Sequence, residues 1–284
     1  MRPLTIERNL IKIRLEHLFF EGDFIKVKNS HIQVPKCVLK QFENEKQTVF
    51  YYDPSVNEVK MGRSRTLNTE EGYYSNQMED ILNNSIENPL GNLIAEIKKY
   101  DFSKLPIPIP KNIESVVFKY FDSLLARSTI TINKFDESIY LQFLPKQNQH
   151  DIAVFSMLSE TPAEKRLGEY IITLCVNFTD ITFVLPAIGV FSYHYNNDSF
   201  INIPITPTLC FHLIKTDKPE KYIKNNSVAL WKIDEREITR SMNAAAFVSE
   251  LSGNKRFIAS PNRDELELLK SQFDSGKFND IIKN

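Results

Sequence analysis

The chain has 284 residues, of which 35 are Lys or Arg and 36 are Asp or Glu, so the formal net charge is −1 with neutral histidines. This balance argues against a dedicated binder of duplex DNA, whose affinity comes from many contacts between basic side chains and phosphates. Hydrophobic residues make up 42% and charged residues 25%. Both values are typical of a globular chain that buries one or two cores, and they exclude a disordered or fibrous protein.

Glycine is scarce, which excludes several familiar active-site motifs. There are 8 glycines, whereas an average content of about 7% would give roughly 20. No two of them lie close together in the sequence. The Rossmann fingerprint, the Walker A loop, the kinase glycine-rich loop and the nucleophile elbow all need nearby glycines, so none of them is present. The sequence therefore identifies no cofactor.

Histidine and cysteine spacing gives no metal motif. The five histidines include no His-Glu-x-x-His pair, and Cys37, Cys175 and Cys210 form no Cys-x-x-Cys pair. We therefore expect no metal site, and we expect the cysteines to be buried thiols in a reducing compartment, which favours the cytoplasm. No apolar run approaches the roughly 20 residues of a membrane helix, so neither a signal peptide nor a membrane anchor is expected.

The first half of the chain predicts a short helix, a hairpin and two longer helical stretches. Residues 1–28 are ambiguous between helix and strand. Pro35 occupies an expected first helical position, ahead of Val38, Leu39 and Phe42. Segments 48–52 and 56–61 are strand-like and flank a turn at Pro54. A 3.6-residue apolar pattern follows Ser75 as far as Tyr100, with a break or kink expected at Pro89; an extended connector covers 106–110, and a second helix covers 113–127.

The second half predicts a mixture of helices and strands. Helical patterns cover 164–176, 235–251 and 261–273, and strands are expected at 182–192, 200–215 and 256–259. A polar turn is expected at 194–199. Since the strands occur in hairpins and the helices cluster between them, we predict an α+β fold with helices packed on a modest, mainly antiparallel sheet. We expect a single domain over 1–284, with two subdomains meeting near 128–150 as the alternative.

Several short motifs occur in an order that resembles one bacterial family. The motifs are His31-x-x-Val34-Pro35-Lys36-x-x-Leu39, Val49-Phe50-Tyr51-Tyr52-Asp53, Tyr74-x4-Glu79-x2-Leu82-x4-Glu87, Phe121-x2-Leu124-Leu125-x-Arg127, Ile203-Pro204-Ile205-Thr206-Pro207 and Asn243 followed by Arg256. They are similar to the domain of unknown function numbered four-two-three-eight, whose members typically begin with His-Tyr-Val-Pro. The resemblance covers most of the chain from about residue 31. It implies a bacterial source and a shared fold, and it assigns no activity.

His31 and Lys36 form the candidate anion-binding pair. His31 lies just ahead of the helix expected at Pro35, and Lys36 lies in its first turn. Exposed amides and the helix dipole favour anions at such a terminus, where an imidazole can bind phosphate or act as an acid or base. A loop histidine that only packs locally is the competing interpretation.

Glu79, Glu87 and Arg127 are the other candidate catalytic residues. The two glutamates are two helical turns apart on one predicted face, too far apart to share a metal directly. If Arg127 points inward it needs a carboxylate, and we predict a buried pair with Glu79 or Glu87. Such a pair is also the structural alternative to catalysis.

Two further polar groups have a structural interpretation beside a functional one. Asp53, Glu58 and Lys60 superficially resemble the carboxylates and lysine of metal-dependent nucleases, but a solvated hairpin is favoured. His194 and its neighbours fit a substrate loop or a hairpin tip equally well.

Two functions follow from these residues. The first is a cytoplasmic bacterial enzyme, namely an effector-like or toxin-like hydrolase of phosphodiesters or nucleotides, in which His31, Glu79, Glu87 and Arg127 converge; its partner would be a nucleotide or nucleic acid. The alternative is a non-catalytic binding or regulatory protein whose polar residues form a structural network. A solvent-reached cluster favours the first, and a dry, fully paired cluster favours the second.

Overall fold

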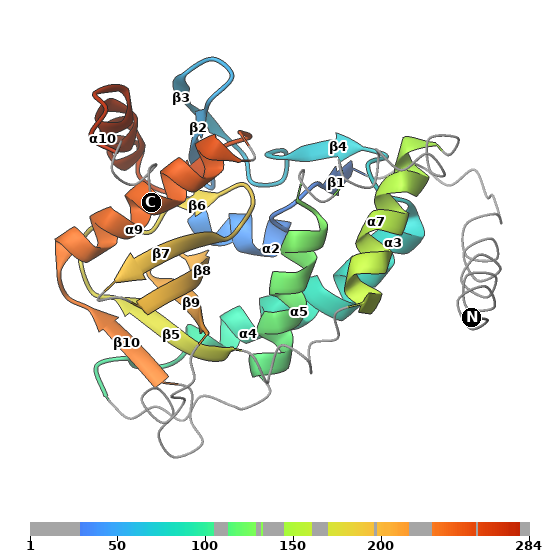
Figure 1. The fold of residues 1–284 in the computed structure, drawn as a ribbon, viewed down its shortest axis with the longest axis horizontal. Coiled ribbons are helices and arrows are strands. Elements are labelled where there is room, and N and C mark those ends of the chain that lie inside the picture. The colour runs from blue at the N-terminus through green and yellow to red at the C-terminus, as the bar shows by residue number, and fades with distance from the viewer. Residues whose placement is uncertain are drawn as a thin grey trace, which may run out of the picture.

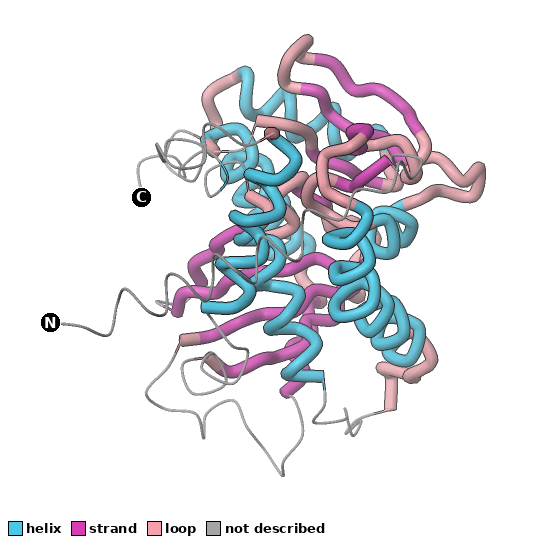
Figure 2. Tube along the Cα trace, turned by 90° about the vertical axis from the view of Figure 1, so that its right-hand side faces the viewer, coloured by secondary structure: helices cyan, strands magenta, loops and turns pink. Residues whose placement is uncertain are grey.

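A computed structural model describes residues 29–104, 113–128, 132, 145–160, 170–195, 198–215, 229–253 and 255–278. Helices and largely antiparallel strands combine into the expected α+β fold (Figure 1). Figure 2 shows two groups of strands, with helical segments running between and alongside them. Among the described helices, none is long and apolar enough to cross a membrane.

The N-terminal part of the described chain contains short strands and one short helical segment. Strands β1 (Asn29–His31) and β4 (Thr69–Glu71) pair antiparallel. Between them lie α2 (Lys36–Leu39), a 3-10 turn (Lys40–Phe42) and the hairpin of β2 (Val49–Asp53) and β3 (Glu58–Gly62). The predicted short helix and hairpin are thus confirmed, although Pro35 caps the helix instead of starting it.

A helical layer follows. It consists of α3 (Asn76–Leu82), a π turn (Asn83–Glu87), α4 (Asn88–Ile97), α5 (Ile113–Ala126) and α7 (Lys146–Glu160). The Ser75 hydroxyl accepts the Met78 N–H and starts α3, as expected of an N-cap serine. The irregularity predicted near Pro89 is the π turn immediately before it. The expected extended connector at 106–110 lies outside the described residues, as do residues 1–28.

The largest sheet has five strands in the order β10-β5-β9-β8-β7. They are β5 (Ile171–Asn177), β7 (Phe191–Tyr195), β8 (Asp198–Thr206), β9 (Leu209–Ile214) and β10 (Ala229–Ile233). Only the β10–β5 pairing is parallel within this sheet. Every residue of β9 is buried, because both faces of this strand are covered.

A second sheet has four strands in the order β3-β2-β11-β6. It extends the β2–β3 hairpin by β11 (Ile258–Ser260) and β6 (Leu185–Pro186). Helix α9 (Arg236–Ser252) lies along the five-stranded sheet in Figure 1, and α10 (Arg263–Asp274) packs near the β2–β3 hairpin. The late helices and the short strand between them are therefore confirmed, with bounds shifted by one or two residues.

Two hydrophobic cores hold these layers together. One joins α3, α4 and α5 to a face of the five-stranded sheet. The other joins the opposite face to α9 and α10. The alternative boundary near 128–150 falls largely outside the described residues.

Two sequence predictions are wrong in detail. The helix predicted at 164–176 is contradicted in its second half, because Ile171–Asn177 form the buried strand β5, and residues 164–169 lie outside the described residues. Apart from Thr173 and the terminal Asn177, the residues of β5 are Ile, Leu, Cys and Val, and a short, mostly apolar run does not distinguish a helix from a strand buried on both faces. The strand predicted at 182–192 is interrupted by a non-strand segment between Pro186 and Phe191. The strand predicted at 200–215 is divided into β8 and β9 by a tight turn at Pro207. Strand β10 and helix α7 were not predicted.

Candidate functional site

Arg127 is a deeply buried charged side chain among the sequence-predicted site residues. It follows the last residue of α5 and is 1% exposed. Its Nη1 donates to Glu87 Oε1 at 3.1 Å, and the Glu87 side chain is 15% exposed. This is one of the two pairs predicted for Arg127. It joins the end of α5 to the π turn.

The π turn places Glu87 at this position. The Asn88 N–H donates to the Asn83 carbonyl, five residues back, instead of the α-helical four. Pro89 has no N–H to continue an α-helical ladder, and its ring clashes with the preceding turn, so a wider turn is the accommodation. Such single π turns are frequent at functional sites.

One edge of the Arg127 guanidinium has no partner in the part of the chain that the structure describes. Among the described residues, no hydrogen-bond acceptor lies in reach of its Nε or Nη2. These two nitrogens form the edge of the guanidinium that can donate two parallel hydrogen bonds to one carboxylate or phosphate. Burying such donors unpaired is costly, so native structures rarely leave them without a protein group, a water or an ion.

Tyr120 and Tyr74 lie near enough to this guanidinium to raise its pKa. Tyr120 precedes Arg127 by seven residues, so both side chains lie on one face of the α5 axis. The Tyr120 hydroxyl is also without a partner among the described residues, whereas the Tyr74 hydroxyl donates to the Ile32 carbonyl at 3.0 Å. Burial raises the pKa of both tyrosines well above the ordinary value, so both stay neutral hydroxyl groups.

Arg127 stays charged despite its burial. Desolvation lowers its pKa, but Glu87 and the two tyrosines outweigh that effect and raise the pKa above its ordinary value. The site therefore carries a permanent positive charge that one carboxylate, Glu87, balances within the described residues.

His31 is the neutral base at this site. It ends β1, where its backbone pairs with Thr69. Its ring hydrogen-bonds to the Leu67 carbonyl, and since Nδ1 has no partner among the described residues, Nε2 is the donor. Burial first, then the charges of Arg127 and Lys36, lower the pKa of His31 to about 4. At pH 7 the imidazole is therefore neutral, and Nδ1 presents a lone pair.

The remaining sequence candidates lie at the edge of this cluster. Lys36 is exposed, and the helix that it begins has only four residues, so the terminus offers little dipole to an anion. Glu79 lies near enough to Tyr74 to raise the pKa of the phenol, but it is Glu87 that pairs with Arg127. Burial, then Glu87, raises the pKa of Cys37 to about 12, so its thiol is not a nucleophile.

Other polar residues singled out in the sequence are used within the fold. Asp53 bonds Ser55 and pairs with Lys60 at 2.8 Å, which is the solvated-hairpin interpretation. Asn243 accepts the Val184 N–H and donates to the Thr182 carbonyl and to Glu265. It therefore ties α9 to the loop before β6. His194 is exposed on β7 and pairs with Ser199 of β8, so both ends of the turn expected at 194–199 lie in paired strands, and residues 196–197 lie outside the described residues.

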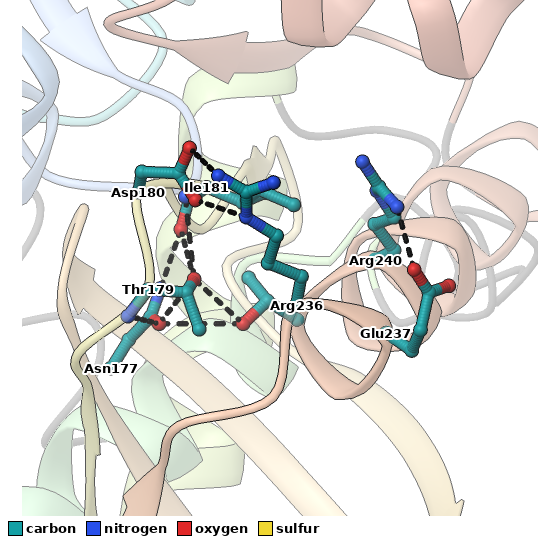
Figure 3. Close-up of polar contacts among 8 residues, drawn as sticks. Asn177, Thr179, Asp180, Ile181, Arg236, Glu237 and Arg240 are labelled. Carbon is teal, nitrogen blue, oxygen red and sulfur yellow. Dashed lines mark hydrogen bonds and ion pairs between the residues drawn. The ribbon is translucent and has the colours of Figure 1, made fainter.

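A second polar cluster ties the loop after β5 to the start of α9 (Figure 3). Asp180 accepts two hydrogen bonds of 2.6 Å from Arg236, and Arg240 pairs with Glu237 on the same helix. The Thr179 hydroxyl in the loop donates to Asn177 Oδ1 at the end of β5, and both residues contact Thr239. The cluster is saturated by its own contacts, so we assign it to structure.

Tyr120 was not predicted as a site residue, because it lies within the helix predicted at 113–127 among mostly apolar neighbours. The sequence feature that could have identified Tyr120 is its seven-residue spacing from Arg127. This spacing is about two helical turns, so it places the hydroxyl and the charged group on the same side of the helix. Within the described residues, no group of three or more His, Cys, Asp or Glu side chains could hold a metal ion.

Comparisons with known proteins give no relative from which to transfer a role. No protein family, curated protein or solved structure matches the chain. The candidate site therefore depends on its own geometry.

Proposed function

We propose that this protein binds a small oxyanion, such as a phosphate group, on the free edge of Arg127. The observation that carries the proposal is a guanidinium, 1% exposed, whose Nε and Nη2 have no acceptor among the described residues. The Tyr120 hydroxyl, which has no partner among the described residues and lies near enough to Arg127 to be influenced by its charge, adds another donor. Donors, positive charge and burial together are the properties that recognise a phosphate or carboxylate group.

A purely structural network explains the cluster less well. A structural ion pair is expected to satisfy the remaining hydrogen-bonding groups, because each unpaired buried donor costs free energy. Here His31, Tyr120 and Arg127 all keep atoms that have no partner among the described residues. The partial exposure of His31 and Glu87 gives the cluster an edge at the surface, by which a ligand can enter.

The burial also bears on the class of ligand. The free guanidinium edge lies inside the protein, so it suits the phosphate group of a small molecule such as a nucleotide and is poorly placed for a nucleic-acid backbone. The three cysteines, Cys37, Cys175 and Cys210, are free thiols, and this is the support for a cytoplasmic location.

Hydrolysis of a phosphoester is a second candidate function. It is favoured by the neutral His31, whose Nδ1 lone pair could accept a proton from an attacking water. A base with a pKa of about 4 is weak at neutral pH. Binding is therefore the primary proposal. Hydrolysis would be supported if the wild type turns over a chromogenic phosphodiester or phosphomonoester and His31→Gln does not.

Calorimetric titration with inorganic phosphate at pH 7 and low salt tests the primary proposal. The wild type should bind one phosphate per chain. Tyr120→Phe, which removes one hydroxyl and leaves no partner unsatisfied, should weaken binding severalfold, while Arg127→Lys should abolish it because a lysine cannot donate the paired hydrogen bonds.

The matched control is Tyr52→Phe, a buried tyrosine in the second core. This variant should bind phosphate as the wild type does. Failure of the wild type to bind phosphate, with acetate and methyl phosphate giving no heat either, contradicts the proposal.

A further inference from the structure

Two of the three cysteines face each other across the centre of the five-stranded sheet. Cys175 of β5 is the direct antiparallel partner of Cys210 on β9. Both residues are 0% exposed and both belong to the second core, so their side chains lie on the same face of the sheet. Cys37, in contrast, lies on α2 and packs against the first core. The fold therefore brings two free thiols together and holds the third elsewhere.

The pairing of Cys175 with Cys210 has the dimensions that a disulfide needs. The Asn177 N–H donates to the Thr208 carbonyl at 2.9 Å. Hydrogen-bonded pairs alternate along an antiparallel ladder, so the two cysteines, two positions further on, also form a hydrogen-bonded pair, whose Cα atoms lie about 5.5 Å apart. Disulfides span Cα separations of about 4.4–6.8 Å. A bond between the two sulfurs therefore requires no large movement of either strand.

Burial determines when such a bond can form. Desolvation raises the pKa of both thiols well above the ordinary value, and the neighbouring Cys210 adds to this effect at Cys175. The thiolate is the form that reacts, and a reagent cannot reach either residue while the sheet is closed. The folded, closed sheet therefore protects the pair from oxidation.

Cys175 lies nearer than Cys210 to the end of the sheet. Strand β10 is the end strand of the described sheet and pairs with β5, where Trp231 is the direct partner of Cys175. Local opening costs less free energy at the margin of a fold than in its central strands. Separation of β10 therefore exposes Cys175 first.

We propose that Cys175 and Cys210 are a redox modification site, which a small disulfide such as oxidised glutathione converts into a cross-strand disulfide that locks β5 to β9. The Cys175 thiolate attacks the oxidant, which gives a mixed disulfide and releases one reduced glutathione. The Cys210 thiolate then attacks the Cys175 sulfur, so the protein disulfide forms and the second glutathione leaves. The two protein thiols are oxidised, the oxidant is reduced, and the two protons end on the released thiols.

The bond changes the stability of the sheet, which goes beyond the proposed anion site. It closes a loop from residue 175 to residue 210, so it restricts the unfolded chain more than the folded one. In a reducing compartment, protein disulfides are usually transient and redox-sensing. The pair thus makes the stability of the second core respond to oxidation.

Refolding from urea in a buffer of oxidised and reduced glutathione tests the proposal. The open chain gives the oxidant access to every cysteine, so burial cannot prevent the reaction. Peptide mapping by mass spectrometry should find the Cys175–Cys210 link in most refolded molecules. The thermal midpoint of this oxidised form should exceed that of the reduced protein by about 5 °C or more. The matched control Cys37→Ser should give the same link in the same yield.

Pulse alkylation of the reduced protein in dilute urea tests the order of exposure. Cys175 should be modified faster than Cys210, and an equal or slower rate overturns this order. Refolded protein in which both cysteines stay free, or in which either is linked to Cys37, overturns the modification site. An oxidised form whose midpoint does not exceed that of the reduced protein overturns the lock. These results use the wild type, so they do not depend on the folding of a variant.

Discussion

At the scale of single residues, the Arg127–Glu87 pair couples stability to the candidate site. Its two atoms lie 3.1 Å apart, and the guanidinium is buried. Removing one partner of a buried pair leaves an uncompensated charge or an unfilled space, whereas an exposed pair contributes little. The same side chain can therefore be essential to the fold and to ligand binding.

Arg127→Ala should lower the free energy of unfolding by about 3–5 kcal/mol. Urea denaturation at pH 7 measures this loss. The control is Arg236→Ala, which breaks the exposed pair with Asp180 and should have a far smaller effect. An unchanged urea midpoint for Arg127→Ala would show that the pair is not buried as described.

His212 is a second residue with unusual burial, and it predicts a dependence of stability on pH. It is fully buried on β9, with both ring nitrogens unpaired among the described residues, and its ring contacts Phe200 and Trp231. Burial lowers its pKa from 6.5 to about 3. The unfolded chain takes up a proton below pH 6.5 and the folded chain does not, so stability falls as the pH drops from 6.5 toward 3.

His212→Leu removes the group that binds a proton only in the unfolded chain. The slope of the free energy of unfolding against pH should therefore decrease by up to about 1.4 kcal/mol per pH unit. Because no partner loses a hydrogen bond, the variant should stay folded at pH 7.5. Guanidinium unfolding at pH 7.5 and 5.0 gives the slope, with the exposed His194→Gln as the control. The same slope in wild type and His212→Leu would mean that His212 titrates normally.

At the scale of secondary-structure elements, local sequence patterns predicted most of the helix starts and the β2–β3 hairpin. Ser75 acts as an N-cap, and Pro89 marks the irregular turn. The exact pairing of Arg127 with Glu87 instead of Glu79 was not accessible from the sequence, because the π turn that sets the position of Glu87 depends on tertiary packing as well as on Pro89. Helix α7 was missed because its residues lack a clear apolar stripe, as its start Lys146-Gln147-Asn148-Gln149 shows.

Ser75→Ala should lower the free energy of unfolding by about 0.5–2 kcal/mol, because the Met78 N–H loses its cap. Thermal denaturation measures the loss. Ser115→Ala, at an exposed position within α5, is the control and should be neutral or slightly stabilising. Equal midpoints for the two variants would contradict the capping role.

At the scale of the whole molecule, the sequence predicted the α+β class because its hairpins and amphipathic helices alternate without a βαβ pattern. It could not predict the division into a five-stranded and a four-stranded sheet. That division depends on β11 joining β2 and β6 across a long sequence separation, and no local pattern encodes such pairing. The candidate site likewise assembles β1, the π turn and α5, which only the folded chain brings together.

The most direct test of the anion site is an NMR observation of the arginine Nε–H signals during titration with phosphate. A hydrogen bond from Nε–H to an oxyanion shifts that proton and slows its exchange with water. We predict that one arginine Nε–H signal, which Arg127→Lys removes, shifts on addition of phosphate while the other arginine signals stay in place. If the Arg127 signal is unchanged at millimolar phosphate, the guanidinium edge does not bind the anion and the account of this site is wrong.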